Sequence, residues 1–262
     1  MKHIGALHLH STHSYDGKLS LLELKQLFQK NGLSFACMTE HSDTLTAETA
    51  AVFVAECRAL SDESFVFVPG FEVPYQQAHI LHVGATQFVT AFADATTLRA
   101  WRQVTPLVVL AHPVRNNFVV DETLADCLDG VEVWNQHYDG KRAPRPRSFT
   151  LLSALRKKKP LIATGGIDLH RAEHFGSPLV QLELAELSET AVISALKAGQ
   201  FTFGNNEYTS GAKAEAALPL SLRLKSALSI VVIMIGKNVN AALAAGGLSL
   251  PKPLKRFIRG RV

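Results

Sequence analysis

Histidine, aspartate and glutamate residues recur along the first 170 residues, most of them where a short apolar run ends. Imidazole nitrogens and carboxylate oxygens are ligands that zinc, manganese and iron ions use in proteins. A buried imidazole or carboxylate without a partner costs about 2 kcal/mol or more, so burying many of them together without a cation would be very unfavourable. The sequence therefore predicts a metal site made by His8, His10, Asp16, His41, Glu72, His79, His112, Asp168 and His170.

The spacing within this set carries more information than any single member. His8 and His10 are separated by one residue, and alternation along a strand would point both imidazoles to the same side. Asp168 and His170 repeat this spacing at the end of a later apolar run. A lone pair of this kind is more often incidental than a metal site, and a histidine in an apolar run, such as His79, is usually a core residue. The metal interpretation depends on the joint pattern.

Seven apolar runs, each long enough for a strand, must position these residues. The runs are 4–10, 35–39, 65–68, 79–84, 107–111, 130–134 and 161–165, and helical patterns cover 19–30, 46–60, 95–102, 148–158 and 189–198. Strands that alternate with helices predict parallel pairing, so we expect an α/β fold, either a small barrel or an open doubly wound sheet. The carboxyl ends of barrel strands meet on one face, which would bring the nine residues together.

Length and composition are consistent with one barrel-sized domain. The chain has 262 residues, 47% of them hydrophobic, and the residues of the metal set all precede residue 219. We therefore expect a barrel over residues 1–218 and a separate extension over 219–262. Cys37, Cys57 and Cys127 show no CxxC spacing and are expected to be buried thiols in a reducing cytoplasm. The N-terminus lacks the features of a signal peptide, which also favours a cytoplasmic protein.

Residues 3–204 resemble the PHP family, the polymerase and histidinol phosphatase domain. The resemblance is carried by His8-Leu9-His10, Tyr15-Asp16-Gly17, Thr39-Glu40-His41, Gly70-Phe71-Glu72, Ala111-His112-Pro113 and Asp168-Leu169-His170. Residues 196–200 are similar to the turn that closes the family's domain. Glu40 stands where the family more commonly has aspartate, at a position that usually orients the ligands. The chain shows no polymerase-type extension, so we expect a stand-alone module.

The resemblance implies a distorted (β/α)7 barrel that holds two or three divalent ions, which would be Zn, Mn or Fe. His8, His10, Glu72 and Asp168 would bind the first ion, Asp16, His41 and His170 the second, and Glu72, His79 and His112 the third. Glu72 would then bridge two ions. Neighbouring ions lower the pKa of a bridging water, and the resulting metal-bound hydroxide attacks phosphate esters. The resemblance therefore implies a metal-dependent phosphoesterase.

Residues near the metal set are candidates for contact with substrate. Arg115, three residues after His112, is the best candidate for binding phosphate oxygens, and His13 is a candidate acid for the leaving group. Weaker candidates for phosphate binding, for which a surface position is the commoner outcome, are Arg142, Arg145, Arg147 and Arg171. Among the remaining side chains, His82 is expected in the core or at the surface, His137 at the pocket, and Trp134 and Tyr138 in the core or stacked on a base or sugar.

The charge of residues 219–262 differs from that of the preceding chain. This segment carries eight basic and no acidic residues, whereas residues 1–218 have a net charge of −4. Its apolar run 227–235 lies between Lys225 and Lys237 and is shorter than the ~20 residues that a membrane-spanning helix needs. The segment predicts a helix that docks on the barrel or exchanges in a dimer, a membrane-surface anchor, or a contact with a phosphate backbone.

The favoured function is that of a phosphatase or phosphodiesterase whose small phosphorylated substrate is an anionic metabolite or a nucleotide. An exonuclease acting on short oligonucleotides is the alternative that the basic tail and the arginine-rich loop 141–146 suggest. An amidohydrolase is disfavoured because no strand ends in a lysine that could bridge metal ions. A non-catalytic binding or regulatory barrel would be expected to have lost ligands, and here none of the nine is missing.

Overall fold

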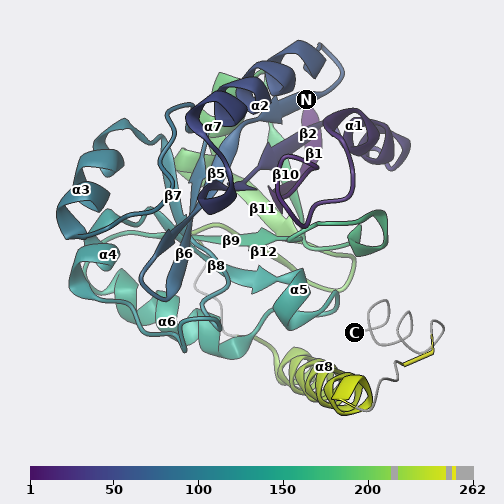
Figure 1. The fold of residues 1–262 in the computed structure, drawn as a ribbon. Helices are drawn as coiled ribbons and strands as arrows, with labels where there is room; N and C mark the ends of the chain where they lie inside the picture. The colour runs from purple at the N-terminus through teal and green to yellow at the C-terminus, as the bar shows by residue number, and fades with distance from the viewer. Residues whose placement is uncertain (214–217, 246–249, 252–262) are drawn as a thin grey trace.

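A computed structural model describes residues 1–213, 218–245 and 250–251 of the chain. In this part of the chain the strands form two six-stranded sheets, with helices packed around the outside of both (Figure 1). In the order of pairing, the first sheet comprises β12 (Thr209–Gly211), β11 (Phe201–Gly204), β10 (Leu179–Glu183), β1 (Lys2–Leu9), β2 (Phe35–Met38) and β4 (Val66–Val68). The second comprises β3 (Glu40–His41), β5 (Gly70–Tyr75), β6 (Ala78–Val83), β7 (Leu107–Leu110), β8 (Gly130–Asn135) and β9 (Ile162–Gly166).

The α/β class is confirmed, and the two sheets approach each other at several places. The chain passes directly from the first sheet to the second where β2 ends at Met38 and β3 begins at Glu40, and again between β4 and β5. Elsewhere, Leu9 and Leu169 form an isolated parallel bridge, and the Ile167 amide donates to the Leu7 carbonyl at 3.0 Å. The strand pairing of the described residues does not make one continuous barrel, so the predicted (β/α)7 barrel is not shown by it.

Parallel pairing, which the alternation of strands and helices predicts, holds for only part of the structure. β1, β2 and β4 are parallel, as are β7, β8 and β9, but β5–β6–β7 are antiparallel. β5 and β6 are antiparallel because the two-residue turn between them makes a hairpin and is too short for a parallel crossover. Glu72, expected at the end of a third strand, therefore lies within β5, a separate strand that begins after Pro69.

Local sequence signals account for most helix boundaries. The helices are α1 (Leu21–Lys30), α2 (Ala47–Leu60), α3 (Ala95–Val104), α4 (Glu122–Cys127), α5 (Gln136–Asp139), α6 (Pro146–Arg156), α7 (Glu189–Ala198) and α8 (Leu220–Ala245). Ser20 and Glu23 form a capping box at the start of α1. Gly199 ends α7 in a left-handed conformation with φ 65°, which glycine adopts without steric cost. The three cysteines are buried free thiols, as expected.

The C-terminal helix is longer than its apolar run. The sequence predicted a segment too short to span a membrane, because only the apolar run 227–235 was counted. In the structure Leu220–Leu243 forms a helical segment of 24 residues with a mean hydropathy of 1.6. By length and composition alone it could span a bilayer. In Figure 1 α8 lies beside α5, outside the layers formed by the sheets and the other helices. Its start falls close to the expected boundary at residue 218, and the division into two parts stays a prediction.

A single apolar core fills the space between the sheets and helices, and His82 lies within it. The imidazole is 1% exposed, and its Nδ1 lies 2.9 Å from Thr105 Oγ1. Burial lowers the pKa of His82 to about 3, because a protonated imidazole would lose its hydration. A core position, one of the two expected for this residue, is confirmed.

This burial predicts acid sensitivity. The unfolded chain binds a proton at His82 below pH ~6.5 and the folded protein does not, so stability present at neutral pH is lost as the pH falls. Between pH 7 and pH 5 the loss should be about 2 kcal/mol, measured as the difference in the free energy of denaturant unfolding between wild type and His82→Gln. Thr105→Val, which keeps the imidazole, should retain the wild-type pH dependence. The same pH dependence in His82→Gln and wild type would contradict the prediction.

Candidate metal centre

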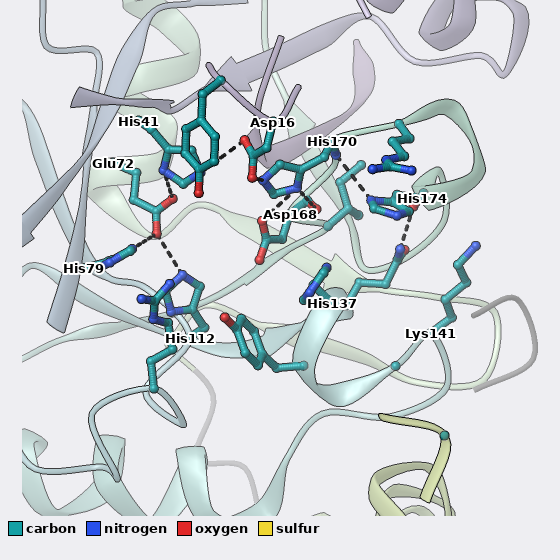
Figure 2. Close-up of a pocket in the computed structure, with 18 of the residues that line it drawn as sticks. Asp16, His41, Glu72, His79, His112, His137, Lys141, Asp168, His170 and His174 are labelled. Atoms are coloured by element: carbon teal, nitrogen blue, oxygen red, sulfur yellow. Dashed lines mark hydrogen bonds and ion pairs between the residues drawn. The ribbon is translucent and has the colours of Figure 1, made fainter. Parts of the chain in front are cut away.

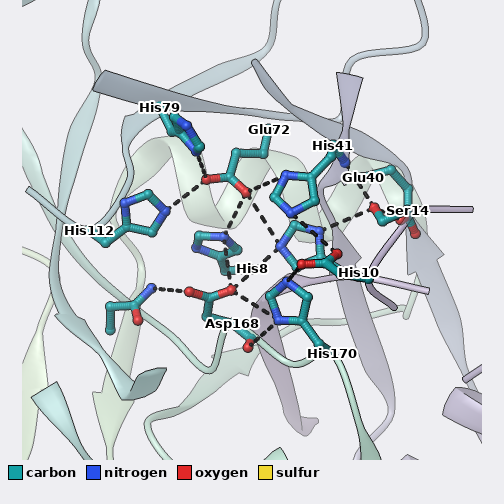
Figure 3. Close-up of polar contacts among 12 residues, drawn as sticks. His8, His10, Ser14, Glu40, His41, Glu72, His79, His112, Asp168 and His170 are labelled. Carbon is teal, nitrogen blue, oxygen red and sulfur yellow. Dashed lines mark hydrogen bonds and ion pairs between the residues drawn. The ribbon is translucent and has the colours of Figure 1, made fainter. Parts of the chain in front are cut away.

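The nine predicted metal ligands come together in one region of the structure. Seven of them line a cavity of about 510 Å³, and these are Asp16, His41, Glu72, His79, His112, Asp168 and His170. Figure 2 shows how they approach from separate loops and strands. His8 and His10 are fully buried beneath the cavity and face the carboxylates of Glu72 and Asp168 (Figure 3).

Four of these side chains point their ligand atoms at one small volume. The Nε2 atoms of His8 and His10 lie 3.4 and 3.5 Å from Glu72 Oε2, and 3.7 and 3.6 Å from Asp168 Oδ1. When four ligands surround an ion tetrahedrally at about 2.1 Å, neighbouring ligand atoms are about 3.4 Å apart. The observed separations are therefore long for hydrogen bonds but suitable for ligands of a shared cation.

The two ring nitrogens that face these carboxylates make no hydrogen bond to any other described residue. Nε2 of His8 and Nε2 of His10 are buried without a hydrogen-bond partner. Their Nδ1 atoms are occupied from behind, that of His8 by Glu132 Oε1 at 2.9 Å and that of His10 by Ser14 Oγ at 3.4 Å. Each imidazole is thus held through one nitrogen while the other faces the carboxylates, an arrangement typical of histidine that binds a metal.

The backbone conformation that directs the candidate ligands differs from the regular strand that was expected. Simple strand alternation does not apply, because His8 has φ 64° at a register shift between β1 and β2, and His10 follows the end of β1. His112 and Asp168, each just after a strand, also have positive φ values of 22° and 50°. Residues other than glycine rarely adopt this region, and such strain is concentrated at functional sites. These left-handed residues therefore turn His8, His112 and Asp168 toward the other candidate ligands.

Glu72 contacts two groups of histidines through different oxygens. Its Oε1 lies 2.5 Å from Nδ1 of His79 and 2.8 Å from Nε2 of His112. Its Oε2 faces His8 and His10, and lies 3.1 Å from Nδ1 of His41. A carboxylate in this position has the geometry needed to bridge two cations.

A further group lies at the cavity mouth. Asp16 Oδ1 is 3.5 Å from Nε2 of His41, and Asp16 Oδ2 is 3.1 Å from Nε2 of His170. The His170 ring stacks on that of His10 with centroids 4.3 Å apart, and its Nδ1 donates to the Asp168 carbonyl at 3.0 Å. The structure thus brings together Asp16, His41 and His170, the three residues expected to bind a second ion.

The electrostatics of the cluster favour positive charge at its centre. Burial alone raises the pKa of Glu72, but His8 and hydrogen bonds from neighbouring imidazoles hold it well below its usual value. Asp168 is likewise kept ionised despite its burial, chiefly by His8. Burial alone lowers the pKa of His8, whereas Glu132, Asp168 and Glu72 raise it well above its usual value. Such buried carboxylates require a compensating cation, which either a proton or a divalent ion could supply.

Glu132 supports the cluster from behind and was not singled out in the sequence. It is 1% exposed in β8, and its second oxygen accepts from the His112 amide at 2.7 Å and from Asn135 Nδ2 at 2.9 Å. Gly166 packs against it so closely that a Cβ there would lie 2.0 Å from Glu132 Oε1. The only signal in the sequence was a glutamate inside an otherwise apolar run, which predicts a buried charge with a dedicated partner.

Glu40 is a second buried acid that supports the candidate ligands from outside the cavity. It is fully buried, and its Oε1 accepts from the Ser11 amide at 2.9 Å and from Ser11 Oγ at 2.7 Å. Its other oxygen accepts from Ser14 Oγ, the hydroxyl that lies beside His10 and receives the His41 amide at 2.9 Å. Glu40 therefore fixes the loop between His10 and Asp16 without facing the cavity, as expected for this position.

The candidate substrate residues divide into two groups. Arg115 and Arg171 line the cavity, together with His137, Tyr138, Lys141 and His174, of which Lys141 and His174 were not singled out in the sequence. Trp134 is a core residue that donates from Nε1 to the Gly140 carbonyl at 2.8 Å, so its alternative stacking role is wrong.

Other candidates are directed elsewhere. His13 does not line the cavity, and its Nε2 lies 2.8 Å from Glu56 Oε2 on α2, so the structure does not support its use as an acid. Arg145 pairs with Asp139 at 2.6 Å, and Arg147 lies over the Phe118 ring at 4.5 Å. Arg142 is exposed outside the cavity. A surface position was the commoner outcome expected for these arginines, and Arg142 and Arg147 are exposed, whereas Arg145 is half-buried.

Comparison with known proteins shows a shared fold. PsfC from Pseudomonas syringae PB-5123 matches with a TM-score of 0.55 and 16% identity, over 88% of this chain and 98% of its own. The lesion-specific endonuclease PfuEndoQ from Pyrococcus furiosus matches with a TM-score of 0.53 and 14% identity, over 79% of this chain and 60% of its own. A Bifidobacterium adolescentis protein, proposed to be a metal-dependent phosphoesterase, matches with a TM-score of 0.48 and 16% identity, over 74% of this chain and 96% of its own. No family model and no curated protein matches the sequence.

The position of Glu132 predicts an effect on metal affinity. Glu132→Gln keeps the shape of the side chain but weakens its hold on the His8 ring, so the dissociation constant for Zn or Mn should rise about 10–100-fold. Isothermal titration calorimetry of the metal-depleted protein measures this constant. Glu63→Gln, at an exposed glutamate outside the cluster, is the matched control. Equal constants for the two variants would show that Glu132 does not position the ligands.

Proposed function

We propose that the chain is a PHP-type phosphoesterase, with a distorted (β/α)7 barrel, that hydrolyses phosphate esters with two or three divalent ions. The observation that carries the proposal is the convergence of His8 and His10 Nε2 with Glu72 Oε2 and Asp168 Oδ1 at 3.4–3.7 Å. Both ring nitrogens are buried without other partners among the described residues. The proposed ligand set is the one expected from sequence: His8, His10, Asp16, His41, Glu72, His79, His112, Asp168 and His170.

The donor set suits the ions that were expected. Imidazole nitrogens and carboxylate oxygens without thiolates favour Zn, Mn or Fe over soft cations, and the high share of imidazole argues against Mg or Ca. When bound, such ions would supply an activated water and would neutralise the phosphoryl oxygens. Glu72 would hold neighbouring ions close together, while Glu132 and Glu40 keep the ligands in place.

Residues at the cavity wall would bind the phosphoryl group. Arg115 lines the cavity near Tyr138. Burial and Asp168 raise the pKa of the Tyr138 phenol above its usual value, and the positive charge of Arg115 partly opposes this shift. Lys141 and Arg171 line the same cavity. Figure 2 shows Lys141 on the opposite side of the view from Glu72. Cationic donors placed around the non-attacking oxygens stabilise the charge that develops in phosphoryl transfer.

The dimensions of the cavity favour a small substrate. Its volume of about 510 Å³ is within the range of pockets that enclose one small molecule, and Gly236, Asn240 and Leu250 form part of its wall. A phosphorylated metabolite or a mononucleotide fits such a space better than a long strand does.

The likeness to an endonuclease keeps a nuclease as the second candidate. The enzyme PfuEndoQ shares the fold, and its activity is directed at a nucleic acid. Incubation with short RNA and with a panel of mononucleotides separates the two functions, since only a nuclease would shorten the RNA. A non-catalytic barrel is disfavoured because all nine ligand side chains are present and face one another.

The proposed function predicts that metal content and hydrolysis are lost together. Wild type should bind at least two Mn, Fe or Zn ions per chain and hydrolyse p-nitrophenyl phosphate or its bis ester. His8→Ala and Asp168→Ala should each lower the metal content and reduce the rate at least ~1000-fold, because both remove ligands of the first ion. Elemental analysis and release of p-nitrophenol measure the two effects. A folded wild type that binds no metal and is inactive would overturn the proposal.

The position of Arg115 predicts a defect in substrate binding without loss of metal. Arg115→Gln should lower kcat/KM about 10–100-fold, since a hydrogen bond to a charged group contributes ~1.5–3 kcal/mol. The metal content should stay at the wild-type value. Arg147→Gln, which changes an arginine outside the cavity, should have little effect on either quantity. If both variants hydrolysed the ester like wild type, Arg115 would not bind the phosphoryl group.

A further inference from the structure

Helix α8 has an unusual distribution of side chains: its buried face is small and polar, and its exposed face is apolar. Ser226 and Ser229 are 0% and 4% exposed and lie toward the rest of the protein, as does Gly236. Leu224 and Leu228, in contrast, are 63% and 61% exposed. A helix packed on a globular domain in water normally shows the opposite pattern.

The exposed apolar side chains form one continuous stripe. They recur at spacings of three and four residues, apart from the adjacent pair Met234 and Ile235, which places them on the same side of a helix. The residues are Leu220, Leu224, Leu228, Val231, Met234, Ile235 and Val239. Isolated exposed apolar residues are common on protein surfaces, but a contiguous patch of this length indicates an interaction site.

The polar face is poorly satisfied by the protein. Ser226 Oγ and Asn240 Oδ1 are buried and have no hydrogen-bond partner among the described residues. The sequence therefore places polar groups where apolar packing would be more stable, and apolar groups where water would be. This arrangement becomes favourable when the outer face meets an apolar medium.

The charge of the segment indicates what that medium is. Residues 219–262 carry eight basic and no acidic residues. Arg223 and Lys225 are exposed at the start of α8, and the basic residues after Pro251 lie outside the described part. A second copy of the chain would bring two strongly positive segments together, whereas anionic lipid headgroups would neutralise them. Apolar stripe and positive charge together match the surface of an anionic bilayer.

The contacts of α8 with the rest of the protein favour lying on a bilayer over crossing it. The helix is long enough to span one. Its start, however, is tied to the domain by an ion pair between Lys225 Nζ and Glu207 Oε2 at 2.5 Å, and Leu222 is buried. A spanning helix would have to leave the rest of the protein after this point, which would remove Gly236 and Asn240 from the cavity wall. It would also transfer Ser226, Ser229 and Asn240 into hydrocarbon, at a cost for each polar group.

We propose that α8 is a membrane-binding helix that lies in the surface of an anionic bilayer, with its apolar stripe among the lipids. Gly236 and Asn240 of α8 also line the cavity that contains the candidate metal ligands. Binding would therefore set the cavity beside the lipid headgroups, where phosphate esters attached to lipids could reach it. This consequence for substrates rests on the proposed function, whereas membrane binding itself does not.

The test is flotation of the full-length protein with liposomes. The protein should float with vesicles of phosphatidylcholine and phosphatidylglycerol at 3:1, and much less with phosphatidylcholine alone or in 1 M NaCl. Leu224→Gln/Leu228→Gln should lower the partition coefficient at least ~10-fold, because two inserted side chains are lost. The control is Val52→Gln/Val119→Gln, which changes two exposed apolar residues outside α8 and should bind like wild type.

Three results would overturn the proposal. One is a failure of wild type to bind either kind of vesicle. Another is a stable dimer in light scattering that Leu224→Gln/Leu228→Gln dissociates, which would assign the stripe to a second copy. The third is membrane-associated protein that resists extraction at pH 11, which would indicate a spanning helix. His8→Ala should float like wild type, so a failure of the phosphoesterase proposal is distinguished from a failure of this one.

Discussion

The carboxylate of Glu72 is buried among five imidazole rings, and an ionised group in that position requires positive charge close to it. This requirement accounts for much of the architecture around it. The hairpin of β5 and β6 brings Glu72 and His79 onto adjacent strands, and the left-handed residues at the ends of β1, β7 and β9 turn further ligands toward them. A sheet of regular strands would direct some of these side chains elsewhere.

The ligand cluster in turn depends on polar residues that never face the cavity. Glu132 connects His8 to the backbone of His112, and Glu40 accepts hydrogen bonds from Ser11 and Ser14 in the loop that leads to Asp16. These are buried acids whose oxygens accept several hydrogen bonds each, so they are fixed in orientation as well as in position. A ligand held in this way has little freedom to lose when it binds an ion, which favours tight binding.

The identity of the site residues could be predicted from the sequence because ligand chemistry is limited to few residue types and these follow apolar runs. All seven predicted strands and all five predicted helices are present, and all nine predicted ligands meet in one place. The antiparallel hairpin at β5 and β6 was missed because Pro69 and the short turn after Tyr75 gave only weak signals beside a continuous apolar pattern. Positive φ values at His8, His112 and Asp168 could not be predicted, since they result from tertiary contacts that override local preference.

The directions of the arginine side chains could not be predicted from the sequence. Arg115, Arg145 and Arg147 were all candidates for phosphate binding. In the structure Arg115 lines the cavity, Arg145 pairs with Asp139 and Arg147 lies over the Phe118 ring. Long flexible side chains choose among partners that only the folded chain brings together. The inverted pattern of α8 was also hidden, because an apolar run with two flanking lysines does not reveal which face the domain covers.

The two sheets meet beside the candidate ligands, and these ligands come from both. His8 lies in the first sheet and His10 and Asp16 follow its strand β1, while Glu72, His79 and Asp168 come from the second sheet or from its carboxyl ends. An ion shared between His8 and Asp168 would act as a cross-link between separately paired halves of the molecule. Unfolding of either half would then require release of the ion. Filling the site would therefore raise the free energy of unfolding of the whole domain.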